Sequence, residues 1–339
     1  MNWIDFRSDT VTKPSAGMLK AMMNAPLGDD VFGEDPTINM LEEKAAQLFG
    51  MEAGLFCPSG TMTNQIAIKM HTQPGDEVIC DFLSHVYQYE GGGIAFNSGA
   101  SVRLLNGDRG RITAKQVQEA INTTDIHKAQ TSLVVLENTS NKGGGSCYEL
   151  SDIEAIHKVC IENNLQLHLA GARLFNALVF KNQSAKNYGS LFHSISICLS
   201  KGLGCPVGSV LLGSKKDITK ARRIRKVFGG GMRQAGVLAA AGIYALDYNV
   251  TRLQEDHLHA KQIEAALLIN KNVERVLPVE TNIILFTIKQ GVNPQEFVSK
   301  LKQKGILAYQ MGPNQIRFVV HVDITKEMVE KTIELLREL

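Results

Sequence analysis

Residues 196–209 have the sequence Ser196-Ile197-Cys198-Leu199-Ser200-Lys201-Gly202-Leu203-Gly204-Cys205-Pro206-Val207-Gly208-Ser209. An apolar run that favours a strand ends at Ser200 and Lys201, and a glycine-rich turn follows. An amine at the end of a buried strand is a candidate nucleophile toward a carbonyl group. Glycines let the backbone approach a bulky ligand without a Cβ clash. Two interpretations stay open: Lys201 carries pyridoxal phosphate (PLP) as a Schiff base, or it is a surface lysine on an ordinary turn.

Composition limits the class of protein. The chain has 339 residues, of which 44% are hydrophobic and 21% charged, and its formal net charge is +2. These values are typical of a globular protein, and without a basic block they argue against a nucleic-acid partner. No run of about 18 apolar residues occurs, so we expect no membrane partner. The six cysteines form no Cys-x-x-Cys pair, so we expect reduced thiols in a cytoplasmic protein and no metal site.

Predicted strands and helices alternate along the chain. This order implies an α/β fold with a mainly parallel sheet and helices on both of its faces. Ligands of such sheets bind beyond the carboxyl ends of the strands. Several polar residues directly follow predicted strands, so we expect them at one shared site: Thr61, His85, Asn138, Arg173 and Lys201.

The length suits one large domain and a smaller one. We expect an N-terminal segment over 1–45 that joins the small domain, a large domain over 46–250 and a small α+β domain over 251–339. Within the first part, apolar residues at steps of three and four predict a helix over 37–49, with Thr37 as its cap.

The stretch Pro58-Ser59-Gly60-Thr61 precedes a helix that we expect over 63–70. Hydroxyls and free amides at a helix N-terminus can bind an anion, so phosphate fits here. An ordinary capped helix is the alternative.

Arg317 lies between apolar neighbours on the last predicted strand. It needs an anionic partner if it points inward, whereas an outward arginine on an edge strand needs none.

Taken together, the chain resembles the PLP-dependent threonine aldolases of the β-eliminating lyase group. The resemblance covers nearly the whole chain and is carried by these phrases: Arg7 to Thr12, Gly28 to Thr37, Pro58 to Thr61, His85 to Glu90, Ser200 to Gly204 and Gly229 to Gly236. It implies PLP fold type I, the aspartate aminotransferase-like fold, in which a mainly parallel seven-stranded sheet forms the PLP-binding domain. It also implies a small amino-acid substrate and a homotetramer with shared active sites.

The resemblance assigns roles to single residues. Lys201, His85 and Glu90 would be catalytic, as the Schiff-base lysine, the residue stacked on the ring and a proton-transfer partner aided by water. The other cofactor-binding residues would be Gly60, Thr61, Arg173, Ala170, Ser200 and, from a neighbouring subunit, Arg233. Substrate or cofactor oxygens would be bound by Ser8, Arg173 and Arg317.

One position departs from the family pattern. Ala170 stands where the family has an aspartate that pairs with the pyridine nitrogen and keeps it protonated, and a methyl group cannot do this. Ser140 stands where many relatives have a histidine, which leaves the choice between L-threonine and L-allo-threonine open. We therefore expect a lyase that cleaves either substrate to glycine and acetaldehyde but is impaired by Ala170. The alternatives are a PLP-fold relative with another amino-acid reaction, such as β-elimination or transamination, and a non-catalytic PLP-binding homologue.

Overall fold

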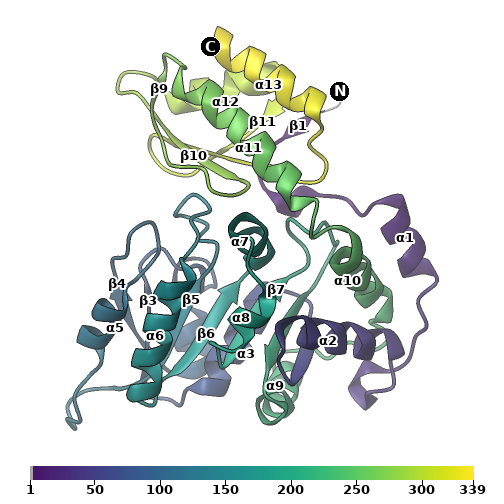
Figure 1. Cartoon of the computed structure of the whole chain (residues 1–339), viewed down its shortest axis with the longest axis vertical. Coiled ribbons are helices and arrows are strands. Elements are labelled where there is room, and N and C mark those ends of the chain that lie inside the picture. Colours follow the sequence, from purple (N-terminus) through teal and green to yellow (C-terminus); the bar gives the residue numbers. More distant parts are fainter. Residues whose placement is uncertain (1–2) are drawn as a thin grey trace.

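A computed structural model describes residues 3–339, which form a large unit and a smaller one (Figure 1). The large unit contains a seven-stranded sheet in the order β2-β8-β7-β6-β5-β3-β4. Strand β8 runs antiparallel to β2 and β7, and all other neighbouring pairs are parallel. The predicted mainly parallel seven-stranded sheet is thus confirmed. The strands are β2 (Ala53–Cys57), β3 (Asp76–Asp81), β4 (Ser101–Leu105), β5 (Gln130–Glu137), β6 (Gln166–Gly171), β7 (Ser194–Cys198) and β8 (Ser209–Gly213).

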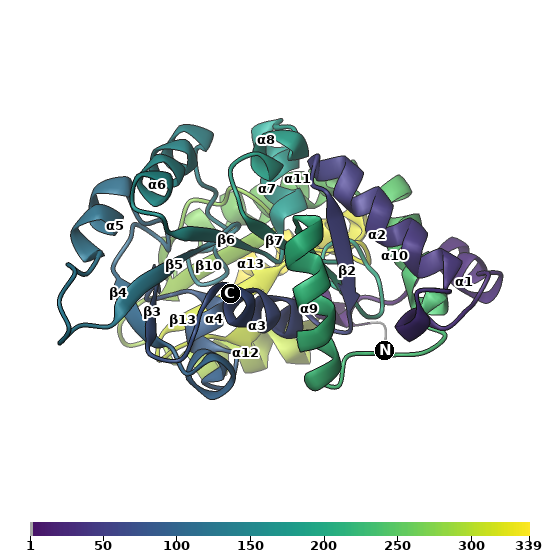
Figure 2. The same ribbon diagram turned by 90° about the horizontal axis from the view of Figure 1, so that it is seen from below.

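Helices cover both faces of this sheet, as Figure 2 shows. One face carries α2 (Pro36–Phe49), α5 (Ala114–Ala120), α6 (Leu150–Glu162), α7 (Leu174–Lys181), α8 (Ala185–Gly189) and α10 (Gly236–Tyr248). The other carries α3 (Gly60–His71), α4 (His85–Gln88) and α9 (Lys215–Val227). Strand β5 explains the arrangement, because Val134 and Leu136 pack toward the first face and Leu133 and Val135 toward the second. A strand that is buried on both faces is a continuous apolar run.

The smaller unit is built around a four-stranded antiparallel sheet in the order β12-β13-β10-β9. Its elements are α11 (Leu253–Leu268), β9 (Val273–Val276), β10 (Ile283–Ile288), α12 (Pro294–Gln303), β11 (Ile306–Leu307), β12 (Tyr309–Gln310), β13 (Gln315–Val319) and α13 (Lys326–Glu338). None of the helices within residues 3–339 has the length and apolar character needed to cross a membrane.

The N-terminal segment contacts both units. Strand β1 (Ile4–Asp5) pairs with β11, and Phe6 stacks on Phe318 in the smaller core. Further on, α1 (Ala16–Met23) and α2 place Met18 and Ile38 in the core of the large unit. The domain boundaries remain predictions. The predicted helix over 37–49 begins at Pro36 and is capped by Asp35, whose carboxylate accepts from the amides of Thr37 and Ile38.

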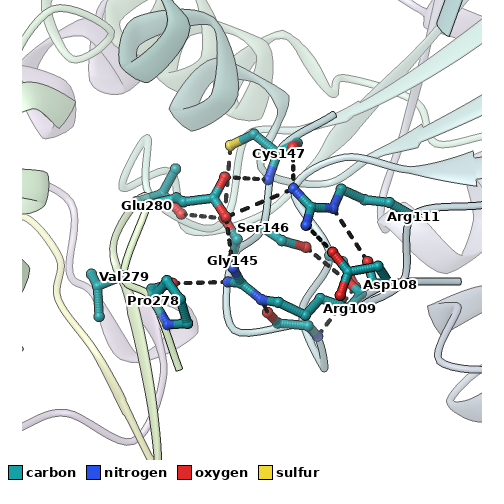
Figure 3. A network of polar contacts seen from close by, with 12 residues as sticks. Asp108, Arg109, Arg111, Gly145, Ser146, Cys147, Pro278, Val279 and Glu280 are labelled. Atoms are coloured by element: carbon teal, nitrogen blue, oxygen red, sulfur yellow. Dashed lines mark hydrogen bonds and ion pairs between the residues drawn. The ribbon is translucent and has the colours of Figure 1, made fainter. Parts of the chain in front are cut away.

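A polar network joins the two units (Figure 3). Arg109 donates to Glu280 Oε1 and to the carbonyl of Pro278, both at 2.8 Å. The other carboxylate oxygen, Glu280 Oε2, accepts from the amide of Cys147 at 3.0 Å. The network therefore ties the loops that follow β4 and β5 to the smaller unit.

Candidate active site

A cavity of about 270 Å³ opens beyond the carboxyl ends of β5, β6 and β7, beside the N-terminus of α3. Most of the predicted site residues line it: Gly60, Thr61, His85, Ala170, Arg173, Ser200 and Lys201. Strand ends that are far apart in sequence thus meet at one place, as parallel sheets require. The structure does not bring Ser8, Glu90, Arg233 or Arg317 of this chain to the cavity wall, and each lies in the setting described below.

The N-terminus of α3 forms one wall. The helix begins at Gly60, earlier than the predicted residue 63, and Ser59 caps it by accepting from the amide of Met62 at 3.2 Å. The first amides of a helix have no acceptor within the helix, so those of Gly60 and Thr61 can bind an anion. A Cβ at Gly60 would overlap Sγ of Cys198, so only glycine permits this close approach.

Lys201 lies at the start of the turn that follows β7 and is partly buried. The turn is closed by hydrogen bonds from the amide of Gly204 to the carbonyl of Lys201 (2.8 Å) and from the amide of Leu199 to the carbonyl of Gly208 (2.9 Å). Gly204 and Gly208 have φ of +76° and +119°, a backbone conformation that explains these two glycines. The amine therefore extends from a fixed turn that borders the cavity.

His85 is the first residue of α4 and lines the cavity. Its ring Nδ1 lies 2.9 Å from Glu90 Oε1. Glu90 is buried and also accepts from the side-chain amides of Asn64 (2.8 Å) and Gln65 (2.7 Å). The structure thus places Glu90 behind His85, where it contacts the imidazole and does not face the cavity.

Glu137 lines the cavity as well, and sequence reasoning did not select it. It ends β5, and its carboxylate accepts from the amides of His85 (2.6 Å) and Asn141 (2.8 Å). Burial raises the pKa of Glu137, although these two amides act in the opposite direction. The sequence feature that could have selected Glu137 is its place as an acidic residue at the end of an otherwise apolar strand. Asn64, one turn after Gly60, is a second residue that the sequence did not single out.

Arg173 is held by a buried ion pair. Its Nε and Nη2 both donate to the carboxylate of Asp9 at 2.7 Å. Burial alone would raise the pKa of Asp9, but the charge and hydrogen bonds of Arg173 outweigh it and lower that pKa. Ser8 precedes this acid and accepts from the amide of Thr10 at 3.2 Å. Ser8 is thus the chain neighbour of the acid that pairs with Arg173, and its own hydroxyl forms hydrogen bonds to Thr10.

Arg317 lies on β13, one contact away from the cavity. It is 9% exposed, and it donates to Asn141 Oδ1 at 2.8 Å and to the carbonyl of Arg7 at 3.1 Å. Burial and then the charge of Arg173 lower the pKa of Arg317 to about 10. Its buried Nε has no hydrogen-bond partner within the described chain. Arg317 therefore points inward and can still donate a hydrogen bond from Nε to an anionic ligand.

Arg233 lies away from the cavity, in the glycine-rich turn before α10. Its side chain is 53% exposed and pairs with Asp29 Oδ2 at 3.0 Å. Its predicted role requires a second subunit and remains a prediction.

Ala170 contributes an apolar patch to the cavity. It pairs in register with Glu137 on β5 and with Ser196 on β7, and it is buried. Its methyl group neither donates nor accepts a hydrogen bond. Glu137 is the carboxylate among the residues that line the cavity.

These residues fit PLP at most of its groups. The free amides of α3 fit a phosphate, the amine of Lys201 fits an aldehyde, and the imidazole of His85 can lie against a ring. The Nε of Arg317, which has no hydrogen-bond partner within the described residues, can donate to a carboxylate. Position 170 offers nothing to a ring nitrogen. In residues 3–339, no cluster of three His, Cys, Asp or Glu side chains could hold a metal ion.

Comparison with known proteins identifies the family. The model of the beta-eliminating lyases matches residues 5–290. The chain is 42% identical to the probable low-specificity L-threonine aldolase 2 of Arabidopsis thaliana, over 96% of this chain and 94% of that one. It is 41% identical to the low specificity L-threonine aldolase of Escherichia coli (strain K12), over 96% of each.

A solved structure confirms the fold. The threonine aldolase of Leishmania major matches with a TM-score of 0.87 at 21% identity, over 99% of each chain. The predicted PLP fold type I is thereby confirmed. From the family model and these relatives, the chain belongs to the beta-eliminating lyases, in the group of the low-specificity threonine aldolases.

Proposed function

We propose that this chain is a PLP-dependent aldehyde-lyase that cleaves L-threonine or L-allo-threonine to glycine and acetaldehyde by retro-aldol chemistry. The observation that carries the proposal is the meeting of Lys201, His85, Arg173 and the N-terminus of α3 at one cavity. The names of relatives at 42% and 41% identity support this choice of substrate.

Several residues would hold the cofactor. Lys201 would bind its aldehyde carbon, the amides of Gly60 and Thr61 its phosphate, and His85 one face of its ring, with Ser200 and Arg173 beside them. When bound, PLP supplies an electron sink for the electron pair of the breaking Cα–Cβ bond.

The chain's own side chains orient the substrate and move its proton. Arg317, through its unpartnered Nε, would bind the substrate carboxylate together with Arg173. Ser8 is kept as a further candidate for this group. The ring Nε2 of His85 would accept the proton of the β-hydroxyl, directly or through water, because Nδ1 contacts Glu90. Glu90 would then support His85 without touching the substrate.

We further propose that Ala170 replaces an aspartate that pairs with the pyridine nitrogen in relatives. The methyl group cannot hold the proton on that nitrogen, so the electron sink is weaker. Removal of one electrostatic stabiliser from a buried site commonly costs about 10²–10³ in rate. Turnover of this chain should therefore lie at least that far below the turnover of an Ala170→Asp variant.

The test compares the wild type with Ala170→Asp and Lys201→Ala after purification with PLP. We expect visible absorbance from bound cofactor in the first two proteins and its loss from Lys201→Ala. Acetaldehyde release from L-threonine and L-allo-threonine should rise by about 10²–10³ in Ala170→Asp. Equal rates in wild type and Ala170→Asp would refute the impairment.

The same samples separate the alternatives. A keto acid in place of glycine and acetaldehyde would indicate another amino-acid reaction on this fold, with free ammonia from β-elimination and without it from transamination. Bound cofactor without turnover, in both wild type and Ala170→Asp, would indicate a non-catalytic homologue.

We also propose a cytoplasmic homotetramer in which Arg233 reaches the cavity of a neighbouring subunit, with neither nucleic acid nor membrane as a partner. Exposed apolar side chains support an interface, since Phe96 is 89% and Val227 82% exposed. Sedimentation analysis tests the assembly. Mixing Lys201→Ala with Arg233→Ala subunits, both carrying Ala170→Asp, should restore activity if sites are shared.

A further inference from the structure

A line of buried hydrogen bonds runs from the cavity to the far end of α3. Its steps are His85 Nδ1 to Glu90 Oε1 (2.9 Å), Asn64 Nδ2 to Glu90 Oε1 (2.8 Å), Asn64 Oδ1 to His168 Nε2 (3.3 Å), His168 Nδ1 to Ser194 Oγ (2.9 Å) and Ser194 Oγ to His71 Nε2 (2.9 Å). Glu90, Asn64, His168 and Ser194 are all buried. We call this line the His85–His71 relay.

The hydrogen bonds at Glu90 determine which atoms donate and which accept along the relay. Glu90 contacts three N–H groups, because Gln65 Nε2 donates to its second oxygen at 2.7 Å. The orientation of Gln65 is set independently, since its Oε1 accepts from Asn97 Nδ2 at 3.1 Å. Because N–H groups contact both of its oxygens, Glu90 acts as a hydrogen-bond acceptor. His85 must then donate from Nδ1, and Asn64 must donate from Nδ2.

The remaining steps follow from the chemistry of neutral imidazole. Burial lowers the pKa of His168 to about 3 and that of His71 to about 4, so each ring has one N–H and one bare nitrogen. Because Asn64 Oδ1 is an acceptor, His168 donates from Nε2. Its bare Nδ1 accepts from the Ser194 hydroxyl, whose oxygen in turn accepts from His71 Nε2.

The opposite assignment conflicts with Glu90. The carbonyl of Ser194 also lies 3.1 Å from His168 Nδ1, and a proton on Nδ1 would suit that contact. His168 Nε2 would then be bare, and Asn64 would have to reverse its amide to donate to it. That reversal turns Asn64 Oδ1 toward Glu90 Oε1, which requires a proton on a carboxylate that already has Gln65 and His85 as donors. The first assignment therefore satisfies more groups.

We propose that Asn64 and His168 are positioning residues for His85. Through Glu90 they hold an N–H at Nδ1 of His85, so that the neutral form of this ring presents a bare Nε2 to the cavity. The relay deepens the proposed function, because a bare Nε2 is the form that can accept a hydroxyl proton. The tautomer itself does not depend on the identity of the substrate.

The first test measures the tautomer directly, on the full-length protein as purified. Histidine labelled with ¹⁵N gives separate NMR ranges for a bare and a protonated ring nitrogen, and the His85→Gln variant identifies the signals of His85. Spectra are recorded at a pH high enough to show the neutral ring, in which we expect a protonated Nδ1 and a bare Nε2. A protonated Nε2 with a bare Nδ1 would overturn the proposal.

Two substitutions at His168 form a matched pair. His168→Gln can place an N–H near the position of Nε2 and should keep the His85 tautomer, whereas His168→Leu removes the donor and should give a mixture of both tautomers. His127→Gln, on the surface, is the control that should change nothing. An unchanged tautomer in His168→Leu would overturn the role of His168. If that variant does not fold, Ser194→Ala breaks the relay with a smaller side chain, and the same two outcomes apply.

The kinetic test uses the Ala170→Asp background. There, His168→Leu should lower kcat about tenfold with KM and cofactor absorbance unchanged, which is less than the roughly 10²–10⁴ of a whole acid–base group because His85 remains. His168→Gln should restore most of kcat. Equal kcat in the two variants would contradict the proposal. Absence of threonine cleavage in the background protein would overturn the proposed function alone, because the tautomer measurement needs no turnover.

Discussion

Two arginines of the large unit form ion pairs with distant parts of the chain, and their surroundings differ. Arg173 pairs with Asp9 beside the cavity, where their side chains are 5% and 0% exposed. Arg109 pairs with Glu280 at the junction of the two units, where the values are 14% and 16%. Arg109 also contacts the carbonyls of Gly143 and Pro278. The inner pair has little else to satisfy its charges, whereas the outer pair has backbone partners and access to water.

This difference separates a pair that the site requires from a pair that mainly joins two units. Removing one partner of a fully buried ion pair leaves an uncompensated charge, which is strongly destabilising. Pairs with access to water contribute far less. The two pairs should therefore respond very differently to single substitutions.

The largest effect is expected from Asp9→Asn. This variant leaves the Arg173 guanidinium buried without a counter-charge, so the free energy of unfolding should fall by about 3–5 kcal/mol. Urea unfolding followed by circular dichroism measures the change. Asp125→Asn, at an exposed loop position, serves as the control. A loss below about 1 kcal/mol, the range of exposed pairs, would show that water reaches the inner pair.

An intermediate effect is expected from pH. Because the pKa of Asp9 is lowered in the folded protein, its contribution to stability is fully present above the unfolded value of about 3.9 and is lost as the pH falls through the folded value. The difference in unfolding free energy between wild type and Asp9→Asn should thus be constant between pH 5 and 7 and should narrow toward pH 3. Unfolding curves at these pH values measure it, and a difference that widens toward pH 3 would contradict the assigned direction.

The smallest effect is expected from Glu280→Gln. The amide oxygen can accept from Cys147 or from Arg109 but not from both, so the variant loses one hydrogen bond as well as the charge opposite Arg109. Because Arg109 keeps its carbonyl partners, the unfolding free energy should fall by only about 1–2 kcal/mol. Glu274→Gln, at an exposed position on β9, is the control. A loss as large as that of Asp9→Asn would mean that the outer network carries the contact between the units.

Sequence patterns predicted the parts of the site that depend on strand ends. Four of the five residues predicted at strand ends line the cavity, because parallel strands bring such ends together: Thr61, His85, Arg173 and Lys201. The fifth, Asn138, is buried outside the cavity wall and accepts from the amide of Tyr148. The same argument predicted the sheet, because buried apolar runs alternate with helices.

Hydrogen-bond partners that are far apart in sequence could not be predicted in this way. Asn64 and His168 are 104 residues apart, and no local pattern connects them. The family resemblance made Glu90 a proton-transfer partner, whereas the structure places its carboxylate against Nδ1 of His85, behind the ring. The cap of α2 shows the same limit at short range, since Asp35 and Thr37 are both good caps and Asp35 also accepts from the amide of Gly236.

Strand β5 contributes side chains both to the core of the large unit and, through Glu137, to the wall of the cavity. Leu133 and Val135 lie on the face of the sheet that holds Ala170. Glu137, two residues after Val135, ends the strand with its side chain on that same face. A deletion of one residue within β5 would reverse these faces and move the Glu137 carboxylate to the opposite side of the sheet. A change in length should therefore be better tolerated in the loops around β5 than within the strand, where a substitution alters this wall of the cavity without reversing the faces.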